Sequence, residues 1–344
     1  MNLQNKRLLI EAKPGLGDTI MTTPALRALK KMFPTLVISM LVRPAAVPLF
    51  DRLPFISHVY AYPRGNVCNA LRLAYALSRQ DIVIFTTWVS LWARFLPYLH
   101  IPLRAGFCKE AYKERGYFTK NLHGVGYWGD IWRPFAVKKQ IEEALNMEIP
   151  LEGAQQNLVI SDPTEAEIHS LDRKLHTEGW KGEPFVAIMP FGHSDQNIPL
   201  KMVDDILPVF KQHGLVPIIS GENPLPPEWQ NTLHKKVIDL CGKINLRELI
   251  ALLDRAKLVF CNDSGHMHIA SARQTLNVAL FAIDIPARWA SNFTIPITAG
   301  LSCSATCSRP IALTCPHKKC LTGITKEMVE TAVLKALKKI ELSS

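Results

Sequence analysis

The chain of 344 residues is 48% apolar, which favours two globular domains of ordinary size over one simple core. Its longest uncharged apolar stretch near the tryptophan-rich region, at residues 82–93, is shorter than the roughly 20 residues of a membrane-spanning helix, so no such helix is predicted. The net charge of +10 lies wholly in residues 1–150, where 20 Lys and Arg oppose 10 Asp and Glu, because residues 151–344 carry 20 of each sign.

A basic half is typical of a protein that meets an anion, and nucleic acid, an acidic membrane surface and a phosphorylated acceptor all qualify. A solvated basic face without a dedicated partner explains the same counts. The opening residues lack the long apolar segment and the small-residue cleavage site of a secretory signal, so a cytoplasmic location and reduced cysteines are expected.

Short apolar runs predict two series of buried strands, separated by helical or turn-rich stretches. The first series is 7–12, 36–42, 58–63 and 81–86, and the second is 184–190, 215–221, 236–242, 256–263 and 276–283. This alternation predicts an α/β protein with two doubly wound parallel sheets, whose ligands bind beyond the carboxyl ends of the strands.

The polar, turn-rich segment at 148–157 predicts the boundary between a first domain of residues 1–155 and a second domain of residues 156–324. A helix is expected soon after the boundary, with Asp162 as its N-cap. The last helix, which starts at 325, carries a single apolar stripe and is therefore expected to pack on a core.

One strand end carries residues that suit a phosphate. The stretch CNDSGHMHIASA is expected to begin a helix. The backbone N–H groups of Ser264, Gly265 and His266 would lie at its positive end and could point at a phosphate. Asp263 suits a hydroxyl group or the helix cap, and His268 lies one turn into the helix, within reach of a diphosphate. An ordinary Asp or Ser cap beside a packed histidine is the alternative interpretation.

Two further strand ends carry polar groups of the same kind. MPFGHSD places His193 and Ser194 in a glycine-containing loop, and ISGEN places Glu222 after another strand. A carboxylate at such a position suits a ribose diol, whereas a solvated loop glutamate is the commoner fate of this residue type.

Four motifs follow one another along the chain: GLGDTIMTTPAL near the start, then DLCGKINLRE, NDSGHMHIASA, and finally LF followed by PARW. In this order they resemble glycosyltransferase family 9, the bacterial ADP-heptose:lipopolysaccharide heptosyltransferases. The resemblance implies the GT-B architecture, in which two Rossmann-like domains face each other across a cleft. It places the nucleotide-sugar donor on the second domain and the acceptor on the first, and it implies that residues 325–344 form a helix crossing back to the first domain.

The resemblance also implies roles for single residues. In sugar transfer the acceptor hydroxyl loses a proton while the leaving diphosphate gains negative charge. Asp18, whose position alone suits a helix cap, is expected to be the general base of an inverting transfer. The N–H groups of residues 264–266, with His268 behind them, are expected to stabilise the leaving group. Asp263 and Glu222 are expected to contact the donor, the latter at its ribose.

The sequence departs from the family at the donor site. Gln196 stands where the family usually has a lysine, and losing such a charge commonly removes something like 2–4 kcal/mol of transition-state stabilisation. Lys201, His193 and Arg288 are candidates to supply the charge instead. The family's Gly-x-Thr is also replaced, by AID at 282–284, which leaves the donor open.

Two alternatives therefore remain beside heptose transfer to the inner core of lipopolysaccharide. One is a GT-B transferase that uses another nucleotide sugar or a protein acceptor. The other is a catalytically weak homologue that binds a nucleotide sugar. No convincing Asp-x-Asp motif follows a strand, so transfer without a metal or other required cofactor is expected.

Cysteine and aromatic residues give two further hypotheses. A structural zinc or iron site is one interpretation of the cysteine cluster, and a reduced, unligated set is the other. The aromatic residues of the first half either contact lipid or sugar rings or form an ordinary aromatic core. The cysteines are Cys303, Cys307, Cys315 and Cys320, and the aromatic residues are Trp88, Trp92, Phe95, Tyr98, Trp128 and Trp132.

The basic first half fits an anionic glycolipid acceptor, because the lipopolysaccharide inner core is rich in carboxylate and phosphate. The same charge would hold the protein peripherally on the inner face of the bacterial inner membrane. Candidate acceptor contacts are Arg64, Arg94, Arg104 and Lys120. Nucleic acid is not an expected partner, since no motif interleaves basic residues with stacking aromatics.

Overall fold

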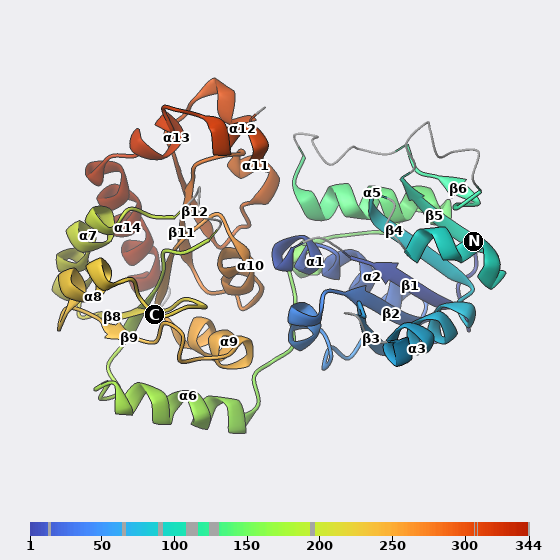
Figure 1. Cartoon of the computed structure of the whole chain (residues 1–344), viewed down its shortest axis with the longest axis horizontal. Coiled ribbons are helices and arrows are strands. Elements are labelled where there is room, and N and C mark those ends of the chain that lie inside the picture. Colours follow the sequence, from blue (N-terminus) through green and yellow to red (C-terminus); the bar gives the residue numbers. More distant parts are fainter. Residues whose placement is uncertain are drawn as a thin grey trace. The chain divides into compact units, whose positions relative to one another are not determined.

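The computed structural model describes residues 1–12, 15–63, 67–88, 92–107, 116–123, 131–192, 197–305, 307 and 309–342. The chain divides into two compact units, Met1–Ser161 and Asp162–Ser344, and each is described by itself (Figure 1). The division falls close to the predicted boundary between residues 155 and 156.

The first unit is built on a six-stranded parallel sheet in the order β3-β2-β1-β4-β5-β6. Its strands are β1 (Arg7–Glu11), β2 (Val37–Val42), β3 (His58–Ala61), β4 (Ile82–Trp88), β5 (Leu103–Phe107) and β6 (Lys120–Asn121). Its helices are α1 (Leu16–Ile20), α2 (Thr23–Met32), α3 (Val67–Ser78) and α5 (Arg133–Leu145), with 3₁₀ helices η1 (Pro44–Leu49), η2 (Trp92–Leu99) and η3 (Gly153–Gln156).

Helices cover both faces of the first sheet, because the central strands are apolar on both sides. On one face α3 and η2 pack together, and Leu77 and Leu96 join Leu9 and Phe85 of the sheet in one buried cluster. On the other face α2 packs against α5. The Pro at the start of α2 and the Asn146 that ends α5 in a left-handed conformation set the limits of these helices.

The second unit repeats this plan with a parallel sheet in the order β12-β11-β10-β7-β8-β9. Its strands are β7 (Phe185–Met189), β8 (Val216–Ile219), β9 (Ile238–Asp239), β10 (Leu258–Asn262), β11 (Asn277–Phe281) and β12 (Thr294–Thr298). Its helices are α6 (Glu165–Thr177), α7 (Leu200–Gln212), α8 (Pro227–Leu233), α9 (Leu246–Arg255), α10 (Gly265–Ala272), α11 (Pro286–Trp289), α12 (Arg309–Thr314), α13 (Lys319–Thr322) and α14 (Lys326–Glu341), with the 3₁₀ helix η4 (Ser302–Ala305).

In the second unit α7 and α14 lie on one side of the sheet and α9 and α10 on the other (Figure 1). The apolar stripe of α14, including Val333 and Leu337, joins Phe210 of α7 and Phe260 of β10 in the core. The resemblance implied that this terminal helix crosses back to the first domain. In the structure it packs on α7, β11 and β12, where its stripe completes the core of the second unit. The implied crossing stays a prediction.

The predicted α/β fold with two doubly wound parallel sheets is confirmed, and all nine predicted strands are present. Three strands were missed, β5, β6 and β12. β5 contains Arg104 and Gly106, β6 has only two residues, and β12 contains Pro296. None of the three therefore has a strand-like apolar run.

The predicted cap of α6 is wrong. Thr164, not Asp162, is the N-cap, because its side chain accepts the N–H of Glu167 and the Glu167 carboxylate accepts the N–H of Thr164. Asp162 instead pairs with Arg273.

Within the described ranges no helix has both the length and the apolar character needed to cross a membrane.

Candidate functional site

In both sheets the strand order reverses at the first strand of the unit. β1 lies between β2 and β4, and β7 lies between β8 and β10. In open parallel sheets ligands bind outside the carboxyl ends of the strands at this reversal. The segments that follow β1, β4, β7 and β10 are therefore the places to examine in each unit.

The segment after β10 is built to leave backbone donors available. Ser264 is the N-cap residue of α10, but its side chain makes no capping hydrogen bond. Its Oγ lies 3.1 Å from Nδ1 of His266 instead. The first N–H groups of the helix, at Gly265 and His266, thus keep their capacity to bind an anion, and the helix dipole adds to the attraction. The interpretation of Ser264 as an ordinary side-chain cap is wrong.

His268 lies one turn into α10 and is 4% exposed. Its Nδ1 is buried and has no hydrogen-bond partner within the described part of the chain. Burial lowers the pKa of His268 to about 4, so the imidazole is neutral near pH 7. A neutral imidazole offers one N–H donor and one acceptor, which suits a hydrogen bond to a phosphate oxygen without adding charge.

Trp289 packs beside His268, with 6.1 Å between the ring centroids. Its Nε1 donates to Oδ2 of Asp284 at 2.7 Å, and Nη1 of Arg288 donates to Oδ1 of the same carboxylate at 2.7 Å. The N–H of Ile285 also donates to Oδ1, at 2.8 Å. These residues of the loop after β11 thus form one hydrogen-bonded cluster against the helix that carries His268.

Neither Asp284 nor Trp289 was among the residues predicted to form the site. The available signal was the replacement of the family's Gly-x-Thr by AID, which ends in Asp284. Asp284 adopts a φ of +77°, a conformation that costs energy for a residue other than glycine. The three hydrogen bonds to its carboxylate offset that cost.

Carboxylates engage both described candidates for the missing lysine charge. Arg288 is 5% exposed and paired with Asp284. Lys201 projects from the first turn of α7 into solvent and pairs with Asp205 at 2.7 Å. The third candidate, His193, lies outside the described residues. So do Ser194 and Gln196.

Two glycines allow the ends of β7, β8 and β10 to approach one another closely. A Cβ atom at Gly192 would lie 2.5 Å from Nδ2 of Asn262, and one at Gly221 would lie 2.8 Å from the ring of Phe191. Glu222, directly after Gly221, is exposed. Glu222, the predicted contact to the donor's ribose, is thus accessible at the carboxyl edge of the sheet.

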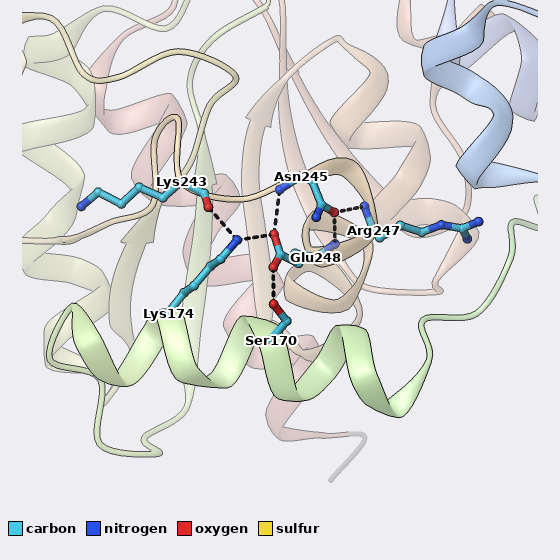
Figure 2. Close-up of polar contacts among 6 residues, drawn as sticks. All are labelled: Ser170, Lys174, Lys243, Asn245, Arg247 and Glu248. Atoms are coloured by element: carbon cyan, nitrogen blue, oxygen red, sulfur yellow. Dashed lines mark hydrogen bonds and ion pairs between the residues drawn. The ribbon is translucent and has the colours of Figure 1, made fainter.

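The DLCGKINLRE motif forms the junction between α9 and α6, which Figure 2 shows. Asn245 caps α9 by accepting the N–H groups of Arg247 and Glu248. The buried Glu248 carboxylate accepts the N–H of Asn245 at 2.8 Å, Ser170 Oγ at 2.7 Å and Lys174 Nζ at 2.7 Å. Burial alone would raise the pKa of Glu248, but these bonds together lower it below its usual value.

In the first unit, Asp18 is the third residue of α1 and is half-buried. Its Oδ2 accepts the N–H of the N-cap residue Gly15 at 3.3 Å, as the third residue of a capping box does, and Asp18 is not itself the N-cap. Gly15 has no side chain to supply the reciprocal bond. The end of β1 adds a buried acid that the sequence analysis missed. Glu11 accepts a hydrogen bond from the Tyr62 hydroxyl, and its carbonyl accepts one from Thr86 Oγ1 at 3.0 Å.

The predicted acceptor contacts differ in their surroundings. Arg94 is exposed on η2, and Lys120 is half-buried on β6. Arg104 donates to the carbonyls of Ile101 at 2.8 Å and Tyr117 at 3.1 Å, so its guanidinium is engaged by the backbone of its own unit. Arg64 lies outside the described residues.

None of the four cysteines is assigned to a disulfide bond in the described part of the chain. Burial, with a smaller effect from Cys303 and Cys315, raises the pKa of the Cys320 thiol. Across the described ranges no three His, Cys, Asp or Glu side chains are arranged to hold a metal ion, so the thiols do not fit a formed site. A structural metal stays a prediction.

A family model described as glycosyltransferase family 9 (heptosyltransferase) matches residues 70–321, most of the chain. The chain belongs to this family. The resemblance drawn from the four motifs is thereby confirmed.

Among the known proteins similar to this chain are a curated heptosyltransferase and solved members of family 9. Lipopolysaccharide heptosyltransferase 3 of Escherichia coli is 23% identical over 292 residues, which cover 77% of this chain and 80% of that protein. A solved family 9 glycosyltransferase from Veillonella parvula aligns with a TM-score of 0.79 at 19% identity, covering 98% of this chain and 99% of the other. E. coli ADP-heptose lipopolysaccharide heptosyltransferase II aligns with a TM-score of 0.68 at 18% identity, covering 97% and 99%.

These alignments establish the fold of the family 9 protein over nearly its whole length. Each unit has the 3-2-1-4-5-6 strand order of a Rossmann-like domain, and two such domains make the GT-B architecture, as predicted. The family assignment makes the protein a glycosyltransferase of the heptosyltransferase family.

Proposed function

We propose that the protein transfers heptose from ADP-heptose to the inner core of lipopolysaccharide, with inversion at the anomeric carbon. The observation that carries the proposal is the uncapped start of α10 with the neutral, buried His268 one turn behind it. Family membership and the names of the similar proteins support the choice of sugar and acceptor.

In this proposal the second unit binds the donor. The N–H groups at Gly265 and His266 and one ring N–H of His268 donate hydrogen bonds to the diphosphate. These donors stabilise the negative charge that grows on the leaving group, and fixed dipoles are effective there because they need no reorganisation. Glu222 is accessible for the ribose, and Asp263 for the sugar or nucleotide. No metal ion is required in this scheme.

The first unit supplies the base. The acceptor hydroxyl oxygen attacks the anomeric carbon, its proton passes to the Asp18 carboxylate, and the bond from that carbon to the diphosphate oxygen breaks to release ADP. A positioned base of this kind contributes roughly 10²–10⁴-fold to the rate. The hydrogen bond from the Gly15 N–H orients one oxygen of the Asp18 carboxylate. Asp18 lies in α1, which follows the carboxyl end of β1.

The acceptor and location follow from charge. The excess of basic residues in residues 1–150 is complementary to the phosphates and carboxylates of an anionic glycolipid. We therefore place the protein on the cytoplasmic side of the inner membrane, attached peripherally.

An Asp18→Asn variant tests the base. The amide oxygen of asparagine can still accept the N–H of Gly15, so the fold should persist while kcat falls by about 10²–10⁴-fold. The assay is transfer from ADP-heptose to truncated lipopolysaccharide, with ADP binding measured by thermal shift and expected to be unchanged. Glu167→Gln is the matched control, because Glu167 has the same capping-box role at α6. An equal fall in kcat in both variants would show that Asp18 is not the general base.

One observation favours a second candidate, a homologue that binds a nucleotide sugar but turns it over weakly. Arg288 and Lys201 are both paired with carboxylates, and Gln196 replaces the usual lysine. A thermal-shift panel of ADP, UDP, GDP and CMP separates the possibilities. A ligand at 100 times its Kd should stabilise by about 2.7 kcal/mol. Stabilisation by ADP without transfer would favour the binder, and preference for another nucleotide would overturn the donor assignment.

A further inference from the structure

Helix α3 turns apolar side chains toward solvent. Val67, Leu71 and Tyr75 are spaced four residues apart, so they share one face, and they are 72%, 66% and 61% exposed. The opposite face carries Leu73 and Leu77, which are buried in the core of the first unit. Helix α3 is thus apolar on both faces, although only one face has a core to cover it.

The neighbouring helix η2 repeats this pattern. Phe95 and Tyr98 are 50% and 77% exposed, while Ala93 and Leu96 are buried in the same cluster as α3. The two elements pack against each other. Of the nine large apolar side chains exposed in the described part of the chain, five belong to α3 and η2. Scattered exposed apolar residues need no explanation, but such a concentration does.

The charge around these side chains has one sign. Arg72 and Arg79 on or beside α3 and Arg94 on η2 are exposed. Between Asp51 and Glu110 the sequence contains one acidic residue, Asp81, whose carboxylate binds Lys6 and the N–H of Arg7. The exposed apolar side chains are therefore flanked by arginines without interspersed acids.

The Arg79 guanidinium carbon lies 4.8 Å from the centroid of the Tyr75 ring. An arginine over a tyrosine combines an apolar stem and ring with a charged end. Such pairs suit the boundary between lipid headgroups and acyl chains, where one end is wet and the other apolar.

We propose that this surface of the first unit docks on a membrane that contains anionic lipids. We call it the docking face, and it consists of Val67, Leu71, Arg72, Tyr75, Arg79, Arg94, Phe95 and Tyr98. The apolar and aromatic side chains enter the headgroup boundary, and the three arginines bind lipid phosphates. Amphipathic surfaces of this composition bind bilayers by burying apolar area and by attraction to anionic lipid.

Charge complementarity favours the membrane over a protein partner of the same sequence. A second copy meeting this face with its own docking face would bring arginine against arginine, which is repulsive. The proposal deepens the peripheral location stated above, but it does not depend on heptose transfer. The experiment therefore contains neither nucleotide nor glycolipid.

Flotation of the full-length protein with lipid vesicles tests the docking face. We expect binding to vesicles of phosphatidylcholine mixed with phosphatidylglycerol, weaker binding to phosphatidylcholine alone, and weakening by salt. The double variant Leu71→Gln with Tyr98→Gln should lower the partition coefficient by about tenfold through lost apolar contact. The triple variant Arg72→Gln, Arg79→Gln and Arg94→Gln should lower it by at least about tenfold and remove most of the salt dependence.

Matched controls remove equivalent groups from the second unit. Ile311→Gln with Leu334→Gln removes exposed apolar side chains, and Lys181→Gln, Lys211→Gln and Lys335→Gln together remove three exposed charges. Both controls should bind vesicles as the wild type does. Hydrogen exchange with vesicles present should slow at α3 and η2 and not at α14, which localises the contact even if a variant misfolds.

Three outcomes would overturn the proposal. They are failure of the wild type to bind anionic vesicles, equal losses in the docking-face and control variants, and exchange protection that excludes both α3 and η2. Loss of self-association in the docking-face variants, with vesicle binding unchanged, would assign the face to a protein interface instead. None of these outcomes bears on whether the protein transfers a sugar.

Discussion

Asp284 combines an unfavourable backbone conformation with an unusual number of bonds. Its carboxylate accepts from the Ile285 N–H, from Arg288 and from the Trp289 indole. It thereby links Trp289, which lies beside His268, to the Arg288 guanidinium. A residue that the family pattern does not contain thus shapes the surroundings of the donor side of the proposed site.

Asp284→Asn should destabilise the protein by about 3–5 kcal/mol, because it leaves the Arg288 guanidinium buried without its counter-charge. Urea titration gives the free energy of unfolding. The double variant Asp284→Asn with Arg288→Met should recover part of the loss, since it removes the buried guanidinium together with its carboxylate partner. If Asp284→Asn were as stable as the wild type, the hydrogen bonds of Asp284 would contribute nothing to the free energy of unfolding.

His268 makes stability depend on pH. Its pKa is about 4 in the folded chain and about 6.5 in an unfolded one, so between these values the unfolded chain binds the extra proton. Stability must therefore fall as the pH drops from 6.5 toward 4, by about 1.4 kcal/mol per pH unit from this group. At pH 5 the loss from His268 should be about 2 kcal/mol relative to pH 7.5.

The His268→Asn variant should accordingly lose less stability between pH 7.5 and pH 5 than the wild type. Urea titrations at the two values measure the difference. His234→Asn, which makes the same substitution at an exposed histidine, is the control. Parallel behaviour of wild type and His268→Asn would mean that the imidazole is not held neutral by burial.

At the scale of elements, the contact between α6 and α9 depends on one buried acid. Glu248 both completes the cap of α9 and receives Ser170 and Lys174 from α6 (Figure 2). The same Lys174 ammonium donates to the Lys243 carbonyl at 2.8 Å. The DLCGKINLRE motif therefore has a structural role in packing α9 against α6.

Lys174→Met should cost about 1.5–3 kcal/mol of stability at neutral pH, because it removes a charged donor from a buried carboxylate. The lowered pKa of Glu248 means that its contribution is present above the unfolded pKa and is lost as pH falls through the folded one. The gap between variant and wild type should therefore shrink in acid.

Lys201→Met is the control for that measurement. The Lys201 side chain is largely exposed and pairs with Asp205 in contact with solvent, so the pair should contribute little to stability. A loss at Lys174 no larger than the loss at Lys201 would contradict the structural role of Glu248.

At the scale of the molecule, each unit has its own buried core. Phe85 belongs to the cluster of the first unit and Phe260 to that of the second, and both are fully buried. Phe85→Ala and Phe260→Ala should each cost about 3–5 kcal/mol, mainly in the unit that carries the change. Hydrogen exchange should show the loss of protection within residues 1–161 for the first variant and within residues 162–344 for the second. Equal loss of protection in both units would indicate one cooperative structure.

The sequence by itself determined the α/β class, nine of the strands, the approximate boundary and the family. These follow from patterns within short segments: apolar runs, helix caps and motif spacing each lie within about a dozen residues. The same logic located the segments with Asp18 and Ser264 at strand ends, because parallel strands place their carboxyl ends at one edge.

Only the tertiary structure decided which side chains meet and which stay exposed. Trp289 meets His268 because neighbouring strands β10 and β11 bring their following loops together, and α14 packs its apolar stripe on β11 and β12. Phe95 and Tyr98, for which an ordinary aromatic core was one interpretation, are exposed to solvent. Whether a side chain is buried, and what it contacts, depends on residues that are distant in the sequence and close in the fold. Its sequence neighbours alone do not specify them.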